Sequence, residues 1–272
     1  MHDLSKTLLI TDLDGTLLPP DKVIPESDLE KIRQFQRDGG SFTIATGRSL
    51  PAVEMYLDMF ELKIPIILYN GSVVYDCGSK KAVVSRLMPQ PASRQMVRDV
   101  IERFPDIGID LITADDKVYV PKLNRLEEEH LEITKVEAVF CGIDDIPDNW
   151  YKLILMREEH LIPELAEFVR SKGYEGIHFV NSHNIYYEAL PAASTKGSAL
   201  TDIRRLCGYE DYTIYAAGDY NNDIEMLEAA DVGICPSNAI DDVKQIADIV
   251  LPQSCSEHFI SAAIDYIYQQ KK

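Results

Sequence analysis

Short apolar runs and amphipathic stretches alternate along the N-terminal part of the chain. Residues 7–11 and 41–45 are short apolar runs of the kind found in buried parallel strands. A third run, 64–69, ends at Asn70-Gly71. Apolar residues recur at helical spacing within 29–35 and 53–60, between these runs. This order predicts a parallel α/β sheet with right-handed crossovers.

The same alternation returns in the C-terminal part. We predict strands at 212–217, 232–234 and 249–251, with helices at 196–206, around 242–246 and up to about 268. The middle of the chain differs, because paired apolar runs flank turn residues within 73–87, 107–121 and 177–190 and predict hairpins. Helical stripes at 96–104 and 161–169 lie between them. Hairpins combined with helices predict an α+β domain inserted into the α/β core.

These patterns set the expected domain boundaries. The core should comprise residues 1–83 and 189–272, and the inserted domain residues 84–188. Within the insertion, the run Glu127-Glu128-Glu129 is expected to form a solvated face.

Charge and cysteine content narrow the classes of function. The formal net charge of -18 argues against nucleic acid and against an anionic membrane surface as partners. No stretch approaches the roughly 18 apolar residues that cross a bilayer, and we expect no signal peptide. The five cysteines are widely spaced and odd in number, which is typical of reduced thiols in a cytoplasmic protein. The sequence specifies no oligomeric state.

Polar residues follow four of the predicted strands. The groups are Asp12 and Asp14, then Thr46-Gly47-Arg48, then Asn70, and finally Asp219 with Asn222 and Asp223. Ligands bind at the carboxyl ends of parallel strands, so these residues should meet in one crevice. Clustered carboxylates repel one another, and a hard dication with oxygen ligands, such as Mg²⁺, relieves that cost. Mg²⁺ also neutralises phosphoryl oxygens, and an Asp carboxylate can accept a phosphoryl group.

Four segments resemble the motifs of the haloacid dehalogenase (HAD) superfamily. They are Asp12-Leu13-Asp14-Gly15-Thr16, Thr46, Thr195-Lys196-Gly197 and Gly218-Asp219-Tyr220-Asn221-Asn222-Asp223, in the family's order. The long insertion after Asn70-Gly71 is similar to the α+β cap (C2B type) of the Cof-type branch, subclass IIB. The resemblance covers the whole chain and implies a Rossmann-like α/β core with an inserted cap domain.

The resemblance also implies residue roles. Asp12 would attack phosphorus, and Asp14 would protonate the leaving group and then activate water. Mg²⁺ would be held by the Asp12 carboxylate, the Asp14 carbonyl and Asp219, with Asp223 supporting its water ligands or orienting Lys196. The phosphate-binding or substrate-binding set would be Thr46, Gly47, Arg48, Asn70, Lys196 and Asn222.

Each of these residues has an ordinary structural alternative. Asp12 and Asp14 could stabilise a strand-end turn, Asp219 and Asp223 could cap a helix, and Lys196 could be a solvated lysine. Thr46-Gly47 and Asn70-Gly71 are also common in turns, and Arg48 could be a surface arginine. We favour function because the motifs agree with one another.

The leading interpretation is a Mg²⁺-dependent phosphatase acting on a small phosphorylated metabolite, with sugar phosphates as the first candidates. One alternative is a phosphosugar mutase or phosphotransferase on the same core. Another is a non-catalytic module that accepts a phosphoryl group for regulation. Release of free phosphate without an acceptor, over many turnovers, separates the first from the other two.

Overall fold

The structure is a computed structural model that describes residues 4–271. The chain divides into two compact units. One contains the residues up to Ser85 and from Thr195 onward, and the other is Arg86–Ser194. Each unit is built around a buried apolar cluster of its own.

The first unit is built on a five-stranded parallel sheet with the strand order β14-β13-β12-β1-β2. Its strands are β1 (Thr7–Thr11), β2 (Ser41–Ile44), β12 (Thr213–Ala217), β13 (Val232–Cys235) and β14 (Ile249–Val250). Strand β1 lies between β12 and β2 and is buried along its whole length. Leu8 pairs with Ile214 on one side and with Ser41 on the other. This arrangement brings the carboxyl ends of β1, β2 and β12 to one edge of the sheet.

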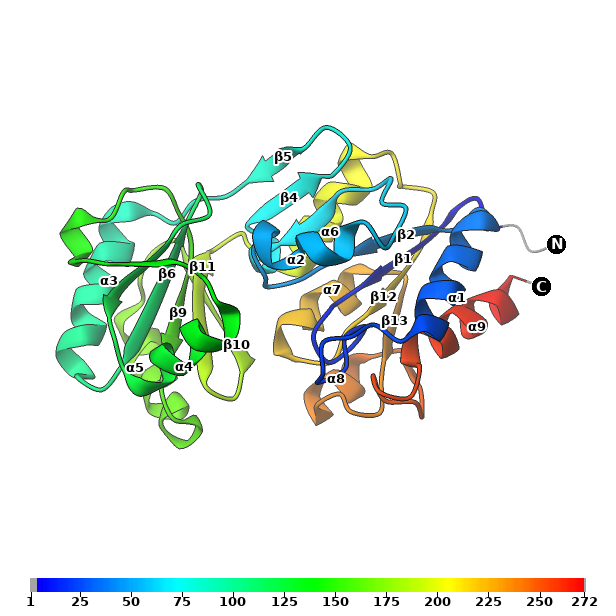
Figure 1. The fold of residues 1–272 in the computed structure, drawn as a ribbon. Helices are drawn as coiled ribbons and strands as arrows, with labels where there is room; N and C mark the ends of the chain where they lie inside the picture. The colour runs from blue at the N-terminus through cyan, green and yellow to red at the C-terminus, as the bar shows by residue number, and fades with distance from the viewer. Residues whose placement is uncertain (1–3, 272) are drawn as a thin grey trace. The chain divides into compact units, whose positions relative to one another are not determined.

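Six α-helices among the described residues connect and cover these strands. They are α1 (Glu26–Arg37), α2 (Leu50–Leu57), α6 (Lys196–Leu206), α7 (Ile224–Ala229), α8 (Asp241–Ile246) and α9 (Phe259–Gln270). Helices α1 and α9 lie side by side although they come from opposite ends of the chain (Figure 1). The rings of Phe35 and Tyr268 meet edge to face, and Asp28 accepts a hydrogen bond from the Ser261 amide at 3.0 Å. Within residues 4–271, none of the helices has the length and apolar character needed to cross a membrane.

The third predicted strand does not join the parallel sheet through a full ladder. Strand β3 (Ile66–Leu68) makes one parallel bridge, between Ile67 and Ala45. It otherwise pairs antiparallel with β4 (Val73–Asp76), which in turn pairs with β5 (Lys81–Ser85), as the hairpin prediction required. The chain reverses at η1 (Tyr69–Gly71), where three successive residues have positive φ. This tight reversal ends β3 after Leu68 and returns β4 antiparallel along it.

The second unit contains a six-stranded sheet with the strand order β10-β11-β9-β6-β7-β8. The strands are β6 (Gly108–Thr113), β7 (Val118–Lys122), β8 (Ala138–Phe140), β9 (Trp150–Met156), β10 (Ile177–His183) and β11 (Tyr186–Pro191). The helices are α3 (Gln90–Arg103), α4 (Arg125–Thr134) and α5 (Ile162–Lys172). Because β11 pairs with both β9 and β10, the unit extends to Ser194, beyond the expected boundary at residue 188.

One charged residue of the second unit lies where the sequence did not predict it. Glu127 is fully buried, whereas Glu128 and Glu129 are exposed, so the prediction of a uniformly solvated acidic run is wrong. Glu127 falls in the first turn of α4, beside the buried Leu126, on the side that faces inward. Neither of its carboxylate oxygens has a hydrogen-bond partner among residues 4–271. Burial, together with the charge of Asp110, raises the pKa of Glu127 to about 8.

This burial predicts a stability that falls as the pH rises. Unfolded Glu127 loses its proton near its ordinary pKa of 4.5, but the folded protein retains it up to about 8. Each pH unit in that window therefore removes at most about 1.4 kcal/mol from the free energy of unfolding. We expect Glu127→Gln, which cannot ionise, to be more stable than the wild type at pH 8 by on the order of 2–4 kcal/mol. The difference should shrink toward pH 5.

Denaturant unfolding at several pH values measures this difference, with Glu128→Gln as the matched control from the same helix. If the free energy of unfolding depended on pH equally in the wild type and in Glu127→Gln, the carboxyl group of Glu127 could not be buried and protonated as described. A residual dependence in both proteins is expected from Asp110, whose pKa burial raises to about 7.

Candidate active site

The site is built around Asp12, the first residue after β1. Its amide donates to the carbonyl of Ala217 in β12 at 2.8 Å, which continues the parallel pairing beyond the strand. The side chain is 6% exposed, and its Oδ1 accepts a hydrogen bond from Lys196 Nζ at 2.6 Å. Burial raises the pKa of Asp12 well above its ordinary value, against the opposing effect of Lys196. A carboxylate in this position is desolvated but supported by one fixed cation.

Lys196 is that cation, and it is fully buried. It is the first residue of α6, where Thr195 caps the helix by accepting from the Ser198 amide. Its ammonium group bonds Asp12 Oδ1 and Asp223 Oδ1, each at 2.6 Å. Burial alone would lower the pKa of Lys196, but the two carboxylates outweigh it and raise that pKa. The ammonium therefore stays charged and is held in place between Asp12 and Asp223.

The loop after β12 is organised by Asp223. Asp223 Oδ2 accepts from the amides of Asp219 at 2.9 Å and Tyr220 at 3.1 Å, so the side chain closes the loop on itself. Asp219 Oδ1 accepts from Thr16 Oγ1 at 2.5 Å, which ties this loop to the segment after β1. Burial, with the neighbouring charge of Asp223, raises the pKa of Asp219 to about 7.

Three of these carboxylates could share a metal ion. Asp12, Asp219 and Asp223 each offer an oxygen, and those oxygens lie within 4.8 Å of one another. Buried carboxylates packed together are the donor set that a hard dication stabilises, and burial raises the pKa of both Asp12 and Asp219. The residues thus fit Mg²⁺. Gly15 permits the approach, since its φ is +84° and a Cβ at that position would overlap the Asp219 carboxylate.

The ends of β2 and β3 supply the opposite side of the site. Thr46 is buried, donates its amide to the Ile67 carbonyl at 2.8 Å and accepts the Asn70 amide at 3.0 Å. Asn222 Nδ2 donates to Asn70 Oδ1 at 2.9 Å, which joins this side to the loop after β12. Gly71, with φ of +101°, packs so closely on the Thr195 backbone that a Cβ would overlap it. Gly47 lies against the Asn70 amide, where a Cβ would come within 3.0 Å.

Asp14 is held by two cations. Arg48 donates from Nε to Asp14 Oδ2 and from Nη2 to Oδ1, both at 2.7 Å. Lys22 Nζ donates to Oδ1 at 2.6 Å. Burial works against the ionised form, yet Arg48 and Lys22 together hold the pKa of Asp14 below its ordinary value.

The structure brings together every residue that the sequence placed in the site, at the ends of β1, β2, β3 and β12 and at the start of α6. The Arg48 guanidinium contacts Asp14 in this site. Two contributors were missed. Thr16 is the last residue of the first motif, but the sequence spacing does not show that its hydroxyl donates to Asp219. Lys22 follows the turn residues Pro19 and Pro20, and no periodicity connects it with Asp14.

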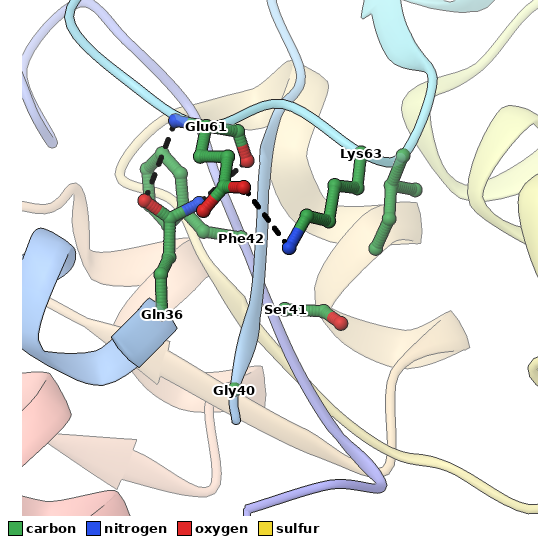
Figure 2. Close-up of a pocket in the computed structure, with 7 residues that line it drawn as sticks. Gln36, Gly40, Ser41, Phe42, Glu61 and Lys63 are labelled. Atoms are coloured by element: carbon green, nitrogen blue, oxygen red, sulfur yellow. Dashed lines mark hydrogen bonds and ion pairs between the residues drawn. The ribbon is translucent and has the colours of Figure 1, made fainter. Parts of the chain in front are cut away.

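A second hollow lies at the other end of β2 (Figure 2). Gln36, Ser41, Glu61 and Lys63 contribute to its lining. Gln36 Nε2 donates to the Glu61 carbonyl at 2.7 Å, and Lys63 pairs with the Glu61 carboxylate at 3.0 Å. These polar groups bind one another rather than converge on a common point, and no metal-type cluster accompanies them within residues 4–271. The site at the carboxyl ends of the strands is the stronger candidate.

Comparison with known proteins identifies the family of this chain. The model of the haloacid dehalogenase-like hydrolase family matches residues 9–264. A 5-amino-6-(5-phospho-D-ribitylamino)uracil phosphatase of Bacillus subtilis is 29% identical, over 94% of this chain and 96% of the relative. The pyridoxal phosphate phosphatase of Escherichia coli is 27% identical, over 93% and 96% respectively.

Solved structures show the same fold. A sugar phosphatase of HAD subclass IIB superposes with a TM-score of 0.83 at 20% identity, covering 96% of this chain and 98% of that one. A protein of Thermotoga maritima gives a TM-score of 0.78 at 24% identity, covering 96% and 97%. The chain therefore belongs to the haloacid dehalogenase-like hydrolases and is a phosphatase.

Proposed function

We propose that the protein is a cytoplasmic, Mg²⁺-dependent phosphatase that hydrolyses a small phosphorylated metabolite through an aspartyl-phosphate on Asp12. The observation that carries this proposal is the buried Lys196, which bonds Asp12 and Asp223 at 2.6 Å each. This buried contact, beside the acidic cluster of Asp12, Asp219 and Asp223, supports the assignment of Asp12 as nucleophile and of Lys196 as the cation for phosphoryl oxygens. Such preorganised charge is the main source of catalysis in phosphoryl transfer.

The residues account for both halves of the reaction. In the first half, a carboxylate oxygen of Asp12 forms a bond to phosphorus while the bond from phosphorus to the leaving-group oxygen breaks. Asp14 gives that oxygen a proton, and Lys196 and Thr46 hold the phosphoryl oxygens. In the second half, water attacks phosphorus and Asp14 takes its proton, which frees Asp12 and inorganic phosphate. Gly47, Asn70 and Asn222 line the phosphate side of the site in this proposal.

The proposed Mg²⁺ ligands are the carboxylates of Asp12 and Asp219 and the main-chain carbonyl of Asp14. Asp223 has both oxygens engaged, by Lys196 and by the amides of Asp219 and Tyr220, so we assign it to orienting Lys196 and this loop. When bound, the dication neutralises charge on the phosphoryl oxygens.

Removal of divalent metal should stop the reaction. We expect EDTA to reduce phosphate release to the background rate and added Mg²⁺ to restore it, because the acidic cluster would otherwise repel the phosphate dianion. Phosphate release assayed before and after metal replacement measures this effect. Undiminished activity in metal-free protein would contradict the metal role.

The substrate class rests on the relatives. Their names assign pyridoxal phosphate and a ribityl phosphate to those proteins, and the subclass IIB structure is named a sugar phosphatase. We propose a phosphomonoester of similar size for this chain, with sugar phosphates as the first candidates. A panel of phosphorylated metabolites, assayed with Mg²⁺ and with Asp12→Asn as the blank, tests this. If no member of a broad panel is hydrolysed above the blank, the proposal is wrong.

Two other functions remain distinguishable in the same assay. A phosphosugar mutase or phosphotransferase would release little free phosphate until an acceptor is supplied. A regulatory module that accepts a phosphoryl group would stop near one phosphate per chain. Sustained phosphate release without an acceptor excludes both. The presence of Asp14 beside Asp12 favours hydrolysis, because a group that activates water serves no purpose in a stable phosphoacceptor.

A further inference from the structure

Asp14 is surrounded by an arrangement of cations that the HAD motifs do not describe. Three N–H groups reach its carboxylate, two from Arg48 at 2.7 Å and one from Lys22 at 2.6 Å. All the residues of this arrangement belong to the first unit. Its significance rests on the proposed function, in which Asp14 exchanges protons with the leaving group and with water.

Arg48 is the rigid member of the arrangement. Its side chain is 23% exposed, and its guanidinium lies 5.7 Å from the ring centroid of Tyr56. The Arg48 amide donates to Thr46 Oγ1 at 3.1 Å, and its carbonyl accepts the Tyr69 amide at 3.1 Å. A guanidinium that binds a carboxylate with two parallel N–H groups fixes the plane of that carboxylate. Arg48 therefore determines how the Asp14 carboxyl group is rotated.

Lys22 reaches the same carboxylate from the segment between β1 and α1. Its side chain is 51% exposed, but its backbone is anchored. The Lys22 amide donates to the Pro19 carbonyl at 2.9 Å, and the Lys22 carbonyl accepts from Tyr56 Oη at 3.1 Å. Tyr56 itself is 3% exposed. One buried tyrosine thus supports both cations, with its ring beside Arg48 and its hydroxyl on the Lys22 backbone.

The two oxygens of Asp14 are used unequally. Oδ1 accepts from Arg48 Nη2 and from Lys22 Nζ, which occupies both of its lone pairs. Oδ2 accepts only from Arg48 Nε among the residues that the structure describes, so it retains one lone pair. We propose that Arg48 and Lys22 are positioning residues for Asp14, and that they leave Oδ2 as the atom through which Asp14 exchanges protons. In the first step the protonated form of Asp14 gives its Oδ2 proton to the leaving-group oxygen as the bond to phosphorus breaks. In the second step the ionised Oδ2 takes a proton from water as that water attacks phosphorus, which restores the protonated form.

The proposal changes the role of Arg48 from substrate contact to alignment, and it gives Lys22 a function. A substrate contact would chiefly affect KM, whereas alignment of a proton donor affects kcat. Alignment of Asp14 would also matter most for substrates whose leaving group needs a proton. An alkyl phosphate expels a basic alkoxide and depends on the acid, but an aryl phosphate with an acidic phenol depends on it little in the first step.

The test compares Lys22→Met, Lys22→Arg and Arg48→Lys with wild type on one alkyl phosphate and one nitrophenyl phosphate. For Lys22→Met we expect kcat on the alkyl phosphate to fall by roughly 5–30-fold, with KM within about twofold. Phenol release in a single turnover with enzyme in excess should stay within about threefold of wild type. Lys22→Arg should recover most of the lost kcat, and Arg48→Lys, which keeps the charge but loses the two-point contact, should not.

Lys117→Met is the matched control, since Lys117 forms an exposed pair with Asp115 at 2.8 Å with similar side-chain exposure. It should leave all these rates unchanged. An increase in KM alone for Lys22→Met would overturn the proposal in favour of substrate binding. Unchanged kinetics, or equal first-step losses on both phosphates, would overturn it as well. Failure of the proposed function is separate, because it would show as no phosphate release by wild type, or as full release by Asp12→Asn.

Discussion

Replacing Asp12 by asparagine is expected to lower turnover by roughly 10⁴-fold or more, to the level of the uncatalysed background. The amide has nearly the shape of the carboxylate but cannot act as the nucleophile, so no covalent intermediate forms. The fold should persist. Burial raises the pKa of Asp12, and the charges of Asp223, Asp219 and Asp14 add to that rise, so loss of its own charge relieves this repulsion. Steady-state phosphate release, together with an unfolding curve, measures both effects.

Asp58→Asn provides the matched control for this substitution. Asp58 is exposed at the end of α2, so Asp58→Asn makes the same chemical change at a position away from the site. It should retain wild-type turnover. Residual activity in Asp12→Asn must be compared with the fraction of protein in which the introduced amide has deamidated, as measured by mass spectrometry. Activity well above that fraction would rule out Asp12 as the nucleophile.

Loss of Lys196 is expected to have the largest effect on stability. Lys196→Met keeps an apolar stem of similar length but leaves Asp12 and Asp223 without the buried cation that pairs with both. Removing one partner of a buried ion pair costs about 3–5 kcal/mol. Turnover should also fall by about 10²–10³-fold, because a charge that holds phosphoryl oxygens in the transition state is gone.

The cause of this instability can be separated from a general packing defect. If it comes from uncompensated carboxylates, then Asp12→Asn introduced into Lys196→Met should recover part of the lost stability, and so should Mg²⁺. Denaturant unfolding of the two single variants and the double variant measures the coupling. Strictly additive effects with no response to Mg²⁺ would show that Lys196 contributes packing alone.

Much of the site could be predicted because its residues occupy strand ends. Asp12, Thr46 and Asp219 each follow an apolar run, and parallel strands end at one edge of the sheet, so their convergence follows from topology. Lys196 could be included because a helix start near the same edge places its side chain close to an anion. In each case a periodic pattern predicts the strand or helix, and the end or start of that element predicts where the side chain lies.

The remaining features depend on contacts that no repeating sequence pattern indicates. Lys22 meets Asp14 because an irregular segment turns back at Lys22, whose φ is +61°, and because Tyr56 of α2 supports the Lys22 backbone. Glu127 is buried because α4 presents its first turn to the sheet, although an acidic run normally faces solvent. Strand β3 is short because the chain reverses at Asn70. These outcomes are set by tertiary packing, which a single sequence does not display.

The central claim is that Asp12 carries the phosphoryl group during turnover. Rapid acid quenching of the Asp14→Asn variant, mixed with Mg²⁺ and a nitrophenyl phosphate radiolabelled in its phosphoryl group, tests this most directly, because that leaving group needs little help from the acid. Loss of the group that activates water should let the intermediate accumulate, since its hydrolysis is slowed. We expect label bound covalently to the peptide that contains Asp12, and none after Asp12→Asn is added to the same variant. Steady phosphate release with no covalent label, or label on another residue, would contradict the account.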